Sequence, residues 1–245
     1  MISMHDITYL QSHYKQYRDI KIQKVFTSKK NAVAYVLYQG KPRVLKWYAP
    51  GFINNIKTEA KVLTKATLKL SIPTLFEYDT THHVLNLSYI PGQNICDLIN
   101  SPATTIPEKE RLIILLAQWF AGFHQFFKTQ ESFLIRGDAT LRNFLFTDRI
   151  WGVDFEETRH GKPIEDIAQL CTSILTTEPM ATEEKFTFCT TFITTYKQNV
   201  TWNLEHLIEE LTYAIIQRIP YRPTEEQQLR KLASNIQANP QILLQ

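Results

Sequence analysis

The chain has 245 residues, which is enough for one large domain or two small lobes with a substantial apolar core. Hydrophobic residues make up 44% of the chain and charged residues 21%, so the composition is that of a folded globular protein and excludes a disordered one. The formal net charge of +3 comes without a dense basic block, which argues against a nucleic-acid partner.

The cysteines and the apolar runs bear on the cellular compartment. Cys96, Cys171 and Cys189 are odd in number and far apart, so they give neither a disulfide framework nor the spacing of metal ligands. The N-terminal residues lack the apolar run of a signal peptide, and no stretch reaches the roughly 18 consecutive apolar residues of a membrane span. A cytoplasmic protein with reduced thiols is therefore expected.

The first third of the chain is predicted to form a small antiparallel sheet with one helix. Runs rich in β-branched and aromatic residues, bounded by turn formers, predict strands at 20–26, 32–38, 43–48, 72–79 and 82–90. Between the third and fourth of these runs the period becomes helical, with one face made by Phe52, Ile56, Glu59, Leu63 and Ala66.

Glu59 is the odd member of that helical face. A carboxylate on an apolar stripe is unfavourable unless a cation meets it, and Lys46 near the end of the preceding strand is the candidate. The alternative is that the apolar stripe of the helix is simply irregular at Glu59.

From Pro91 and Gly92 onwards the pattern becomes helical. Apolar residues at helical spacing predict helices at 108–127, 164–175, 183–196, 203–216 and 224–236. Thr224 is the expected N-cap of the last helix, with Gln227 completing a capping box. The predicted architecture is α+β: a β-rich N-lobe over residues 1–90, a larger helical C-lobe over residues 91–245, and a ligand cleft between them.

The stretch RGDATLRNFLFTDRIWGVDFEE, residues 136–157, contains the polar residues that point to chemistry. Its two short apolar runs, FLF and IWGV, predict a hairpin with TDR as the turn. Asp138 and Asn143 precede the first strand and Asp154 ends the second, so the three side chains are expected to converge. Carboxylate and amide oxygens suit Mg²⁺, which often bridges to substrate phosphates. Together with Lys46 and Glu59, these are the groups that phosphoryl transfer needs.

From about Ile20 to Leu175 the sequence resembles the protein-kinase-like superfamily. It is most similar to the compact branches: aminoglycoside and choline-type phosphotransferases, lipopolysaccharide-sugar kinases, and small atypical kinases of the RIO and Bud32 type. RGDATLRN is similar to their HGDxxxxN catalytic loop, GVDFEE to their IDFE or IDFG metal segment, and GKPIEDIAQL to their GDPxxDLA. VLKWY and TEAKVL carry the strand lysine and the helix glutamate, and LNLSYIPGQNICDLI resembles the hinge that reads adenine.

The resemblance implies a protein-kinase-like bilobal fold, ATP and Mg²⁺ as cofactors, and transfer of the γ-phosphoryl group to a hydroxyl. It implies that Asp138 is the catalytic base or orients the acceptor hydroxyl, and that Asn143 and Asp154 hold Mg²⁺. It further implies that Lys46 contacts the α- and β-phosphates and that Glu59 orients Lys46.

Two further roles follow from the same resemblance. The carbonyl of Ser88 and the N–H of Ile90 are expected to bind adenine at the hinge. Asp166 is expected to tie its helix to the catalytic loop, which is a structural role. His124, on the apolar side of the long helix, is expected to be a hydrogen-bonded core residue.

The sequence departs from the family pattern at three places. The turn before the second strand has no glycine, so Ser28, Lys29, Lys30 or Asn31 is expected either to contact phosphate in its place or to be solvated. Arg136 stands where His is usual, and it either braces Asp154 or marks weakened catalysis. Arg142 is hypothesised to act in catalysis by neutralising charge on the transferred phosphoryl group, with a surface salt bridge as the alternative.

Only the short stretch ETRHGKPIE lies between the DFE of the metal segment and the body of the next helix, which leaves no room for a peptide-binding activation loop. The favoured acceptor is therefore a small hydroxyl compound such as an antibiotic, a sugar or an amino alcohol. One alternative is a compact atypical protein kinase or ATPase that works with a protein partner. The other is a pseudokinase, a binding module that keeps the fold without the chemistry.

Overall fold

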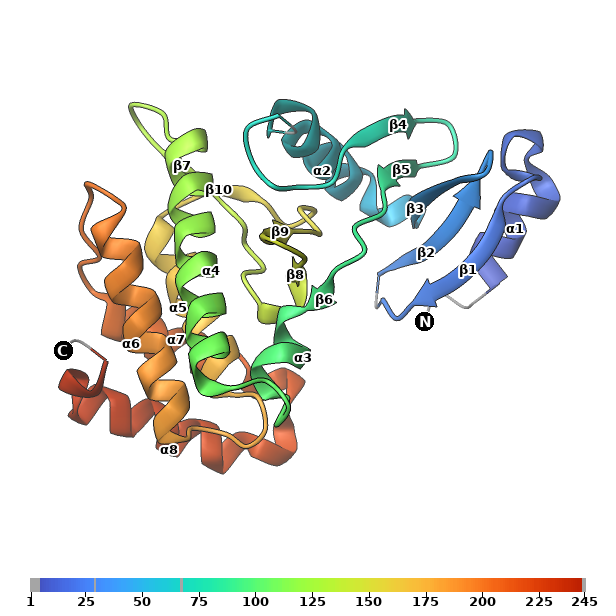
Figure 1. Cartoon of the computed structure of the whole chain (residues 1–245). Helices are drawn as coiled ribbons and strands as arrows, with labels where there is room; N and C mark the ends of the chain where they lie inside the picture. The colour runs from blue at the N-terminus through green and yellow to red at the C-terminus, as the bar shows by residue number, and fades with distance from the viewer. Residues whose placement is uncertain (1–4, 29, 67, 244–245) are drawn as a thin grey trace. The chain divides into compact units, whose positions relative to one another are not determined.

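The computed structural model describes residues 5–28, 30–66 and 68–243, which form two compact units (Figure 1). The first unit comprises Met1–Pro91 together with Trp151–Glu157, and the second comprises Gly92–Ile150 and Thr158–Gln245. An antiparallel sheet dominates the first unit and helices dominate the second, so the predicted α+β class is confirmed. Over the described ranges, every helix is too short or too polar to cross a lipid bilayer.

The first unit is built on a five-stranded antiparallel sheet with the strand order β1-β2-β3-β5-β4. The strands are β1 (Lys21–Phe26), β2 (Asn31–Tyr38), β3 (Lys41–Tyr48), β4 (Leu75–Asp79) and β5 (Val84–Ser88). All five lie where the alternation of apolar and turn-forming residues predicts them. In the register of β2 and β3, Asn31 lies opposite Tyr48 and Val33 lies opposite Lys46.

One face of this sheet is covered by an N-terminal helix, α1 (His5–His13), and the 3₁₀ turn Lys15–Tyr17 that follows it (Figure 1). Ile7, Leu10 and Tyr17 pack there against a buried set contributed mainly by the strands: Ile20, Ala32, Ala34, Val36, Leu45 and Val84. The prediction of a single helix in this part of the chain was wrong. Helix α1 is too short, with too few apolar residues, to show a helical period in the sequence.

Helix α2 (Ile53–Ala66) follows a 3₁₀ turn at Pro50–Phe52. Its buried stripe contains Ile56, Leu63 and Ala66, as the spacing predicts, and it also contains Glu59. Phe52 lies in the preceding turn rather than in the helix.

The second unit contains a short helix followed by longer ones: α3 (Ile95–Asn100), α4 (Ile106–Phe127), α5 (Pro163–Leu175), α6 (Glu183–Gln198), α7 (Leu207–Ile216) and α8 (Glu226–Ala238). Helix α4 packs on α6, and α5 packs on both α6 and α7. Phe188, Phe192 and Tyr196 of α6 are buried, so these aromatic residues belong to the core rather than to a pocket. The five long helices were predicted, whereas α3 was not.

Three predicted helix starts were wrong, including that of α4, which begins at Ile106 instead of Glu108. Helix α7 begins at Leu207 instead of Asn203, because Asn203–His206 form a turn in which the Asn203 carbonyl oxygen Oδ1 accepts the Glu205 N–H at 3.3 Å. Helix α8 begins at Glu226, after a 3₁₀ turn at Pro223–Glu225. Thr224 therefore lies inside that turn and is not the N-cap.

The predicted hairpin is formed by β8 (Phe144–Phe146) and β9 (Ile150–Gly152), and its turn is closed by the Thr147 N–H, which donates to the Arg149 carbonyl at 3.1 Å. A short strand, β6 (Gln93–Asn94), pairs with β8 on the other side. A further pair, β7 (Phe133–Ile135) and β10 (Arg159–Gly161), was not predicted. Each of its strands has three residues, which is too short for a recognisable alternation.

Candidate active site

The face of the β2–β3 pair opposite to α1 carries the residues that matter for chemistry. Directly opposite residues of paired strands share a face, so Asn31 and Val33 of β2 lie on the same side as Val44, Lys46 and Tyr48 of β3. This side is opposite to the one that α1 covers. Val33 and Val44 are half-buried, so an apolar surface borders the lysine.

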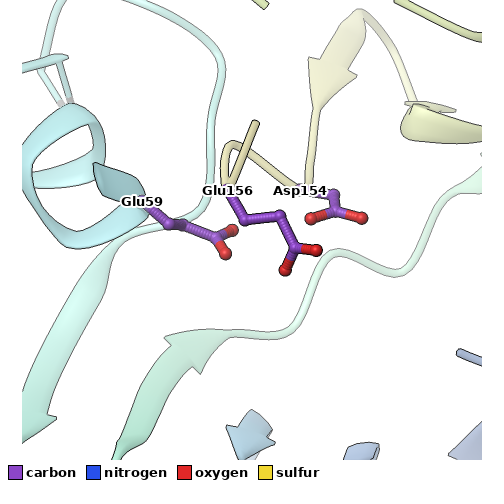
Figure 2. A group of neighbouring side chains, drawn as sticks. All are labelled: Glu59, Asp154 and Glu156. Carbon is purple, nitrogen blue, oxygen red and sulfur yellow. The ribbon is translucent and has the colours of Figure 1, made fainter. Parts of the chain in front are cut away.

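Lys46 is surrounded by three carboxylates of the first unit. Its amine nitrogen Nζ lies 2.7 Å from Oε2 of Glu59, 2.6 Å from Oδ1 of Asp154 and 2.9 Å from Oε2 of Glu156. Figure 2 shows the three carboxylates gathered at one place. Burial acts to lower the pKa of the Lys46 amine, but the neighbouring acids outweigh it and raise the pKa well above its ordinary value. Lys46 is therefore a charged, buried cation.

Glu59 is fixed from three directions. Besides Lys46, the hydroxyl of Tyr48 donates to its Oε2, and the backbone N–H of Phe155 donates to its Oε1 at 3.2 Å. Burial, with Glu59 close by, raises the pKa of the Tyr48 hydroxyl, so that hydroxyl remains a donor. The predicted Lys46–Glu59 pair is present, and the alternative of an irregular apolar stripe is wrong.

Asp154 differs from the other two acids in its accessibility. Its side chain is 40% exposed, whereas those of Glu59 and Glu156 are 2% and 7% exposed. Its backbone has a φ of +63°, which is uncommon for a residue other than glycine and occurs preferentially at functional sites. Oxygen atoms of the three acids lie within 4.8 Å of one another, and the Lys46 amine already supplies them with a cation. Asp154 is thus the member that a soluble ligand can reach.

In the second unit, the loop from Arg136 to Asn143 is held by one face of α5. Backbone N–H groups of the loop donate to side chains of the helix: Arg136 and Gly137 to Asp166 at 2.6 and 3.1 Å, Ala139 to Gln169 at 3.0 Å, and Leu141 to Ser173 at 3.1 Å. The structural role predicted for Asp166 is confirmed. Gln169 and Ser173 were missed, although polar residues at helical spacing on an otherwise apolar helix are a usable signal.

Two details complete the support of this loop. Gly137 has a φ of +73°, a conformation that glycine adopts without strain. His124 is fully buried, with Nε2 3.0 Å from Asp166 and Nδ1 2.8 Å from the hydroxyl of Tyr196. The prediction of a hydrogen-bonded core histidine is confirmed.

The loop leaves Asp138 exposed and Asn143 half-buried. The amide nitrogen Nδ2 of Asn143 donates to the Asp138 carbonyl at 2.9 Å and to its carboxylate oxygen Oδ2 at 3.0 Å. Because the nitrogen is engaged, the amide oxygen of Asn143 is directed away from Asp138. The loop therefore presents one carboxylate and one amide oxygen as candidate ligands or acceptors.

The three arginines near this loop lie in different surroundings. Arg136 is 1% exposed, with its guanidinium 5.6 Å from the ring centre of Trp119 and 5.2 Å from that of Phe144. Arg142 is exposed. Burial lowers the pKa of the Arg218 guanidinium, and the charge of Asp138 opposes that shift, so Arg218 lies near Asp138. The sequence gives no signal for Arg218, which lies two residues beyond the last residue of α7.

The predicted hinge and phosphate-turn residues are only partly described. Ser88 ends β5, where its N–H donates to the Thr74 carbonyl at 2.9 Å and its hydroxyl oxygen accepts the Thr74 N–H at 2.9 Å. Ile90 follows in a segment without regular structure. Adenine binding by Ser88 and Ile90 stays a prediction.

In the turn before β2, the Asn31 N–H donates to the Ser28 hydroxyl at 3.2 Å. Lys30 pairs with Glu157, and Lys29 lies outside the described residues.

Asp138, Asn143 and Arg136 belong to the second unit, whereas Asp154 belongs to the first. Their predicted convergence, including a brace from Arg136 to Asp154, stays a prediction.

No protein-family model and no curated protein sequence matches the chain. Solved structures match it over most of its length. A macrolide 2′-phosphotransferase from Brachybacterium faecium is 13% identical with a TM-score of 0.60, over 88% of this chain and 93% of that one. An ethanolamine kinase from Plasmodium vivax is 12% identical with a TM-score of 0.60, over 92% and 82% of the two chains.

An amicoumacin kinase in complex with AMP-PNP, Ca²⁺ and Ami is 12% identical, with a TM-score of 0.61 over 89% of this chain and 88% of that one. At such identities the likeness establishes the fold. The chain has the protein-kinase-like fold in its compact form, as the resemblance of its motifs implied.

Proposed function

We propose that this chain is an ATP- and Mg²⁺-dependent phosphotransferase that moves the γ-phosphoryl group of ATP to a hydroxyl group of a small molecule. The observation that carries the proposal is the buried Lys46, which Glu59 holds at 2.7 Å and which reaches the exposed Asp154 at 2.6 Å. A lysine fixed in this way can present its charge to nucleotide phosphates. Positioning and electrostatic stabilisation are most of what phosphoryl transfer requires from a protein.

Magnesium fits the chemistry of the available donors. Asp154 offers an accessible carboxylate, and Asn143 offers an amide oxygen whose companion nitrogen is already bonded to Asp138. Hard oxygen donors of this kind suit Mg²⁺. Asp154 and Asn143 would hold the ion, which would neutralise charge on the phosphates.

Asp138 is the proposed acceptor-side residue. Its carboxylate is exposed, and one oxygen is oriented by the Asn143 amide at 3.0 Å. The carboxylate would accept a hydrogen bond from the acceptor hydroxyl and then its proton. The hydroxyl oxygen bonds to the γ-phosphorus as the bond from that phosphorus to the bridging oxygen of ADP breaks.

A small acceptor agrees with the short connection after Glu157. Arg159–Gly161 form β10, which is paired with β7, and α5 starts at Pro163. The connection is thus occupied by regular structure instead of an extended segment that could bind a peptide. The matched structures are named for a macrolide, ethanolamine and amicoumacin, all of which are small molecules.

The first test is a thermal-shift titration of ATP with and without Mg²⁺ on the wild type and on Asp154→Asn. Ligand at 100 times its Kd should raise the free energy of unfolding by about 2.7 kcal/mol. We expect a Mg²⁺-dependent shift in the wild type that Asp154→Asn loses. The control is Asp148→Asn, because Asp148 is an exposed acid in the β8–β9 turn. No shift in the wild type, or an equal shift in Asp154→Asn, contradicts the nucleotide site.

A second assay separates an enzyme from a binding module. Transfer from γ-labelled ATP is measured across a panel of amino alcohols, sugars, aminoglycosides and macrolides. Transfer to any of them supports the proposal. Nucleotide binding without transfer to any acceptor, small molecule or protein, indicates the pseudokinase alternative.

A further inference from the structure

Glu156 is a buried acid, and the need to neutralise the charge of Lys46 does not by itself explain its presence. It is 8% exposed, and its Oε2 lies 2.9 Å from the Lys46 amine. Lys46 carries one positive charge, which Glu59 already balances at 2.7 Å. A second buried carboxylate therefore adds negative charge where removal from water is unfavourable. Unfavourable buried charge of this kind is frequent at functional sites.

The second partner of Glu156 indicates what that function is. The amide nitrogen of Asn31, the first residue of β2, donates to the same oxygen Oε2. Asn31 is 4% exposed and lies on the face of the sheet that carries Lys46. One carboxylate oxygen thus connects the start of β2 to the lysine of β3.

A weaker outer connection runs beside this one. Lys30 pairs with Glu157, and both side chains are more than a third exposed, at 43% and 39%. The Lys30 amine also lies 3.9 Å from Oε1 of Glu156, a longer contact than the 2.9 Å from Oε2 to Lys46. Exposed ion pairs contribute little to stability. The amide of Asn55 in α2 donates to the carbonyl of Glu156 at 3.2 Å and to the side chain of Glu157 at 3.3 Å. These contacts hold the backbone of the segment, and the buried Glu156 side chain makes the link to Lys46.

We propose that Glu156 is a positioning residue. Its side chain fixes Lys46 and the start of β2 relative to each other and so positions them for the nucleotide phosphates. The inference rests on the proposed function. Asp154 is the accessible partner of Lys46 and is the one that a metal-bound triphosphate would engage. Glu59 and Glu156 are buried, so they remain to hold the amine from two sides. Glu156 supplies through side-chain bonds the support that a glycine-rich turn supplies through its backbone.

The test compares Glu156→Ala and Glu156→Gln with the wild type, using Mg²⁺·ATP and adenosine as ligands in calorimetry. Adenosine has no phosphates, so a defect in positioning Lys46 should affect ATP alone. We expect Glu156→Ala to weaken ATP binding roughly tenfold, the size of one charge-assisted hydrogen bond, with adenosine binding unchanged. Glu156→Gln keeps an oxygen that can accept from both partners, so it should recover much of the loss. Glu77→Gln, an exposed acid in β4 of the same sheet, is the control.

Two outcomes overturn the inference: unchanged ATP binding in Glu156→Ala, or equal weakening of ATP and adenosine, which indicates a general structural role. Asn31→Ala breaks the same link from the other side without altering the buried charge. If Glu156→Ala does not fold, Asn31→Ala tests the inference in its place, because it should also weaken the binding of ATP and leave adenosine binding unchanged. If the wild type binds no Mg²⁺·ATP, the proposed function fails first and the positioning role fails with it.

Discussion

In the first unit, Lys46 is held by three acidic side chains, whereas in the second unit the loop from Arg136 to Asn143 is held by backbone N–H groups that donate to α5. The first arrangement is a set of charges around one amine. The second attaches the backbone to a helix and leaves the side chains of Asp138 and Arg142 exposed.

The difference determines how each region responds to a charged ligand. A phosphate can replace a carboxylate on Lys46, since both are anions that accept from the same amine. The bonds from the loop to α5 run from backbone N–H groups of the loop to side chains of the helix, so a ligand does not compete for them. Changes in the first unit should therefore alter nucleotide affinity, and changes in the loop should alter turnover or folding.

The largest effect should come from Asp138→Asn. The substitution keeps the size of the side chain but removes the group that would accept the hydroxyl proton. General-base catalysis is typically worth 10²- to 10⁴-fold, so kcat should fall by roughly that factor. Steady-state transfer assays measure kcat, and calorimetry with Mg²⁺·ATP should show nearly unchanged affinity. Asp148→Asn, at an exposed acid of the same unit, should keep full activity. Wild-type turnover in Asp138→Asn would show that the loop does not carry the chemistry.

The next largest effect should be on folding, from Asp166→Asn. The carboxylate is fully buried and accepts from the backbone of Arg136 and Gly137, with His124 3.0 Å from the same group. An amide in its place would bring an N–H group against one of these donors. We expect a loss of about 2–4 kcal/mol in the free energy of unfolding, measured by urea denaturation. Glu165→Gln, on the half-buried neighbour, should cost less, and equal losses would contradict the special role of Asp166.

The sequence predicts the strands, the long helices and the Lys46–Glu59 contact for physical reasons. Alternation and helical spacing reflect burial on one side of an element, and most of the sheet and the long helices are long enough to show it. Glu59 stands out because a charge on a buried stripe needs a partner. Asp166 was found through the resemblance of its motif, which carries the constraint that spacing alone does not.

The features that were missed depend on contacts far apart in the sequence or on very short elements. The sequence does not indicate the bond between Asn31 and Glu156, since 125 positions separate the two residues along the chain. Arg218 follows α7, which packs on α5, the helix that also holds the loop carrying Asp138. Helix α1 and the pair β7–β10 are too short to produce a periodic pattern.

A smaller effect is expected from Arg142→Ala. The side chain is exposed on the loop, so its removal should not disturb folding. If its charge stabilises the transferred phosphoryl group, kcat should fall about tenfold while the Kd of Mg²⁺·ATP stays the same. Arg149→Ala, at an exposed arginine in the β8–β9 turn, is the matched control. Unchanged kcat would leave Arg142 as a surface residue and restrict the catalytic part of the loop to Asp138 and Asn143.

The smallest effect is expected from Asp79→Asn. This variant tests whether nucleotide binding depends on the type of bond that is lost or on the unit in which the bond lies. Asp79 belongs to the first unit, yet it is held by hydrogen bonds from the Tyr17 hydroxyl at 2.7 Å and the backbone N–H groups of Thr81 and His82 at 3.0 Å, with the His82 ring nitrogen Nδ1 2.7 Å away. Burial acts to raise the pKa of Asp79, but the bonds from Tyr17 and His82 outweigh it and lower that pKa. The fold therefore favours the ionised form, and this stabilisation is present above about pH 4 and is lost as the pH falls through the lowered native pKa.

Asp79→Asn should accordingly reduce the free energy of unfolding by about 1 kcal/mol at pH 7, with the Kd of Mg²⁺·ATP unchanged. The difference from the wild type should shrink as the pH is lowered below about 4, because the wild-type carboxyl then becomes protonated as well. Urea denaturation at pH 7 and pH 3 measures both values, and Asp19→Asn, at an exposed acid of the same unit, is the control. If Asp79→Asn weakens ATP binding as strongly as Glu156→Ala does, affinity follows the integrity of the whole sheet. The charges around Lys46 would then have no separate part in nucleotide binding.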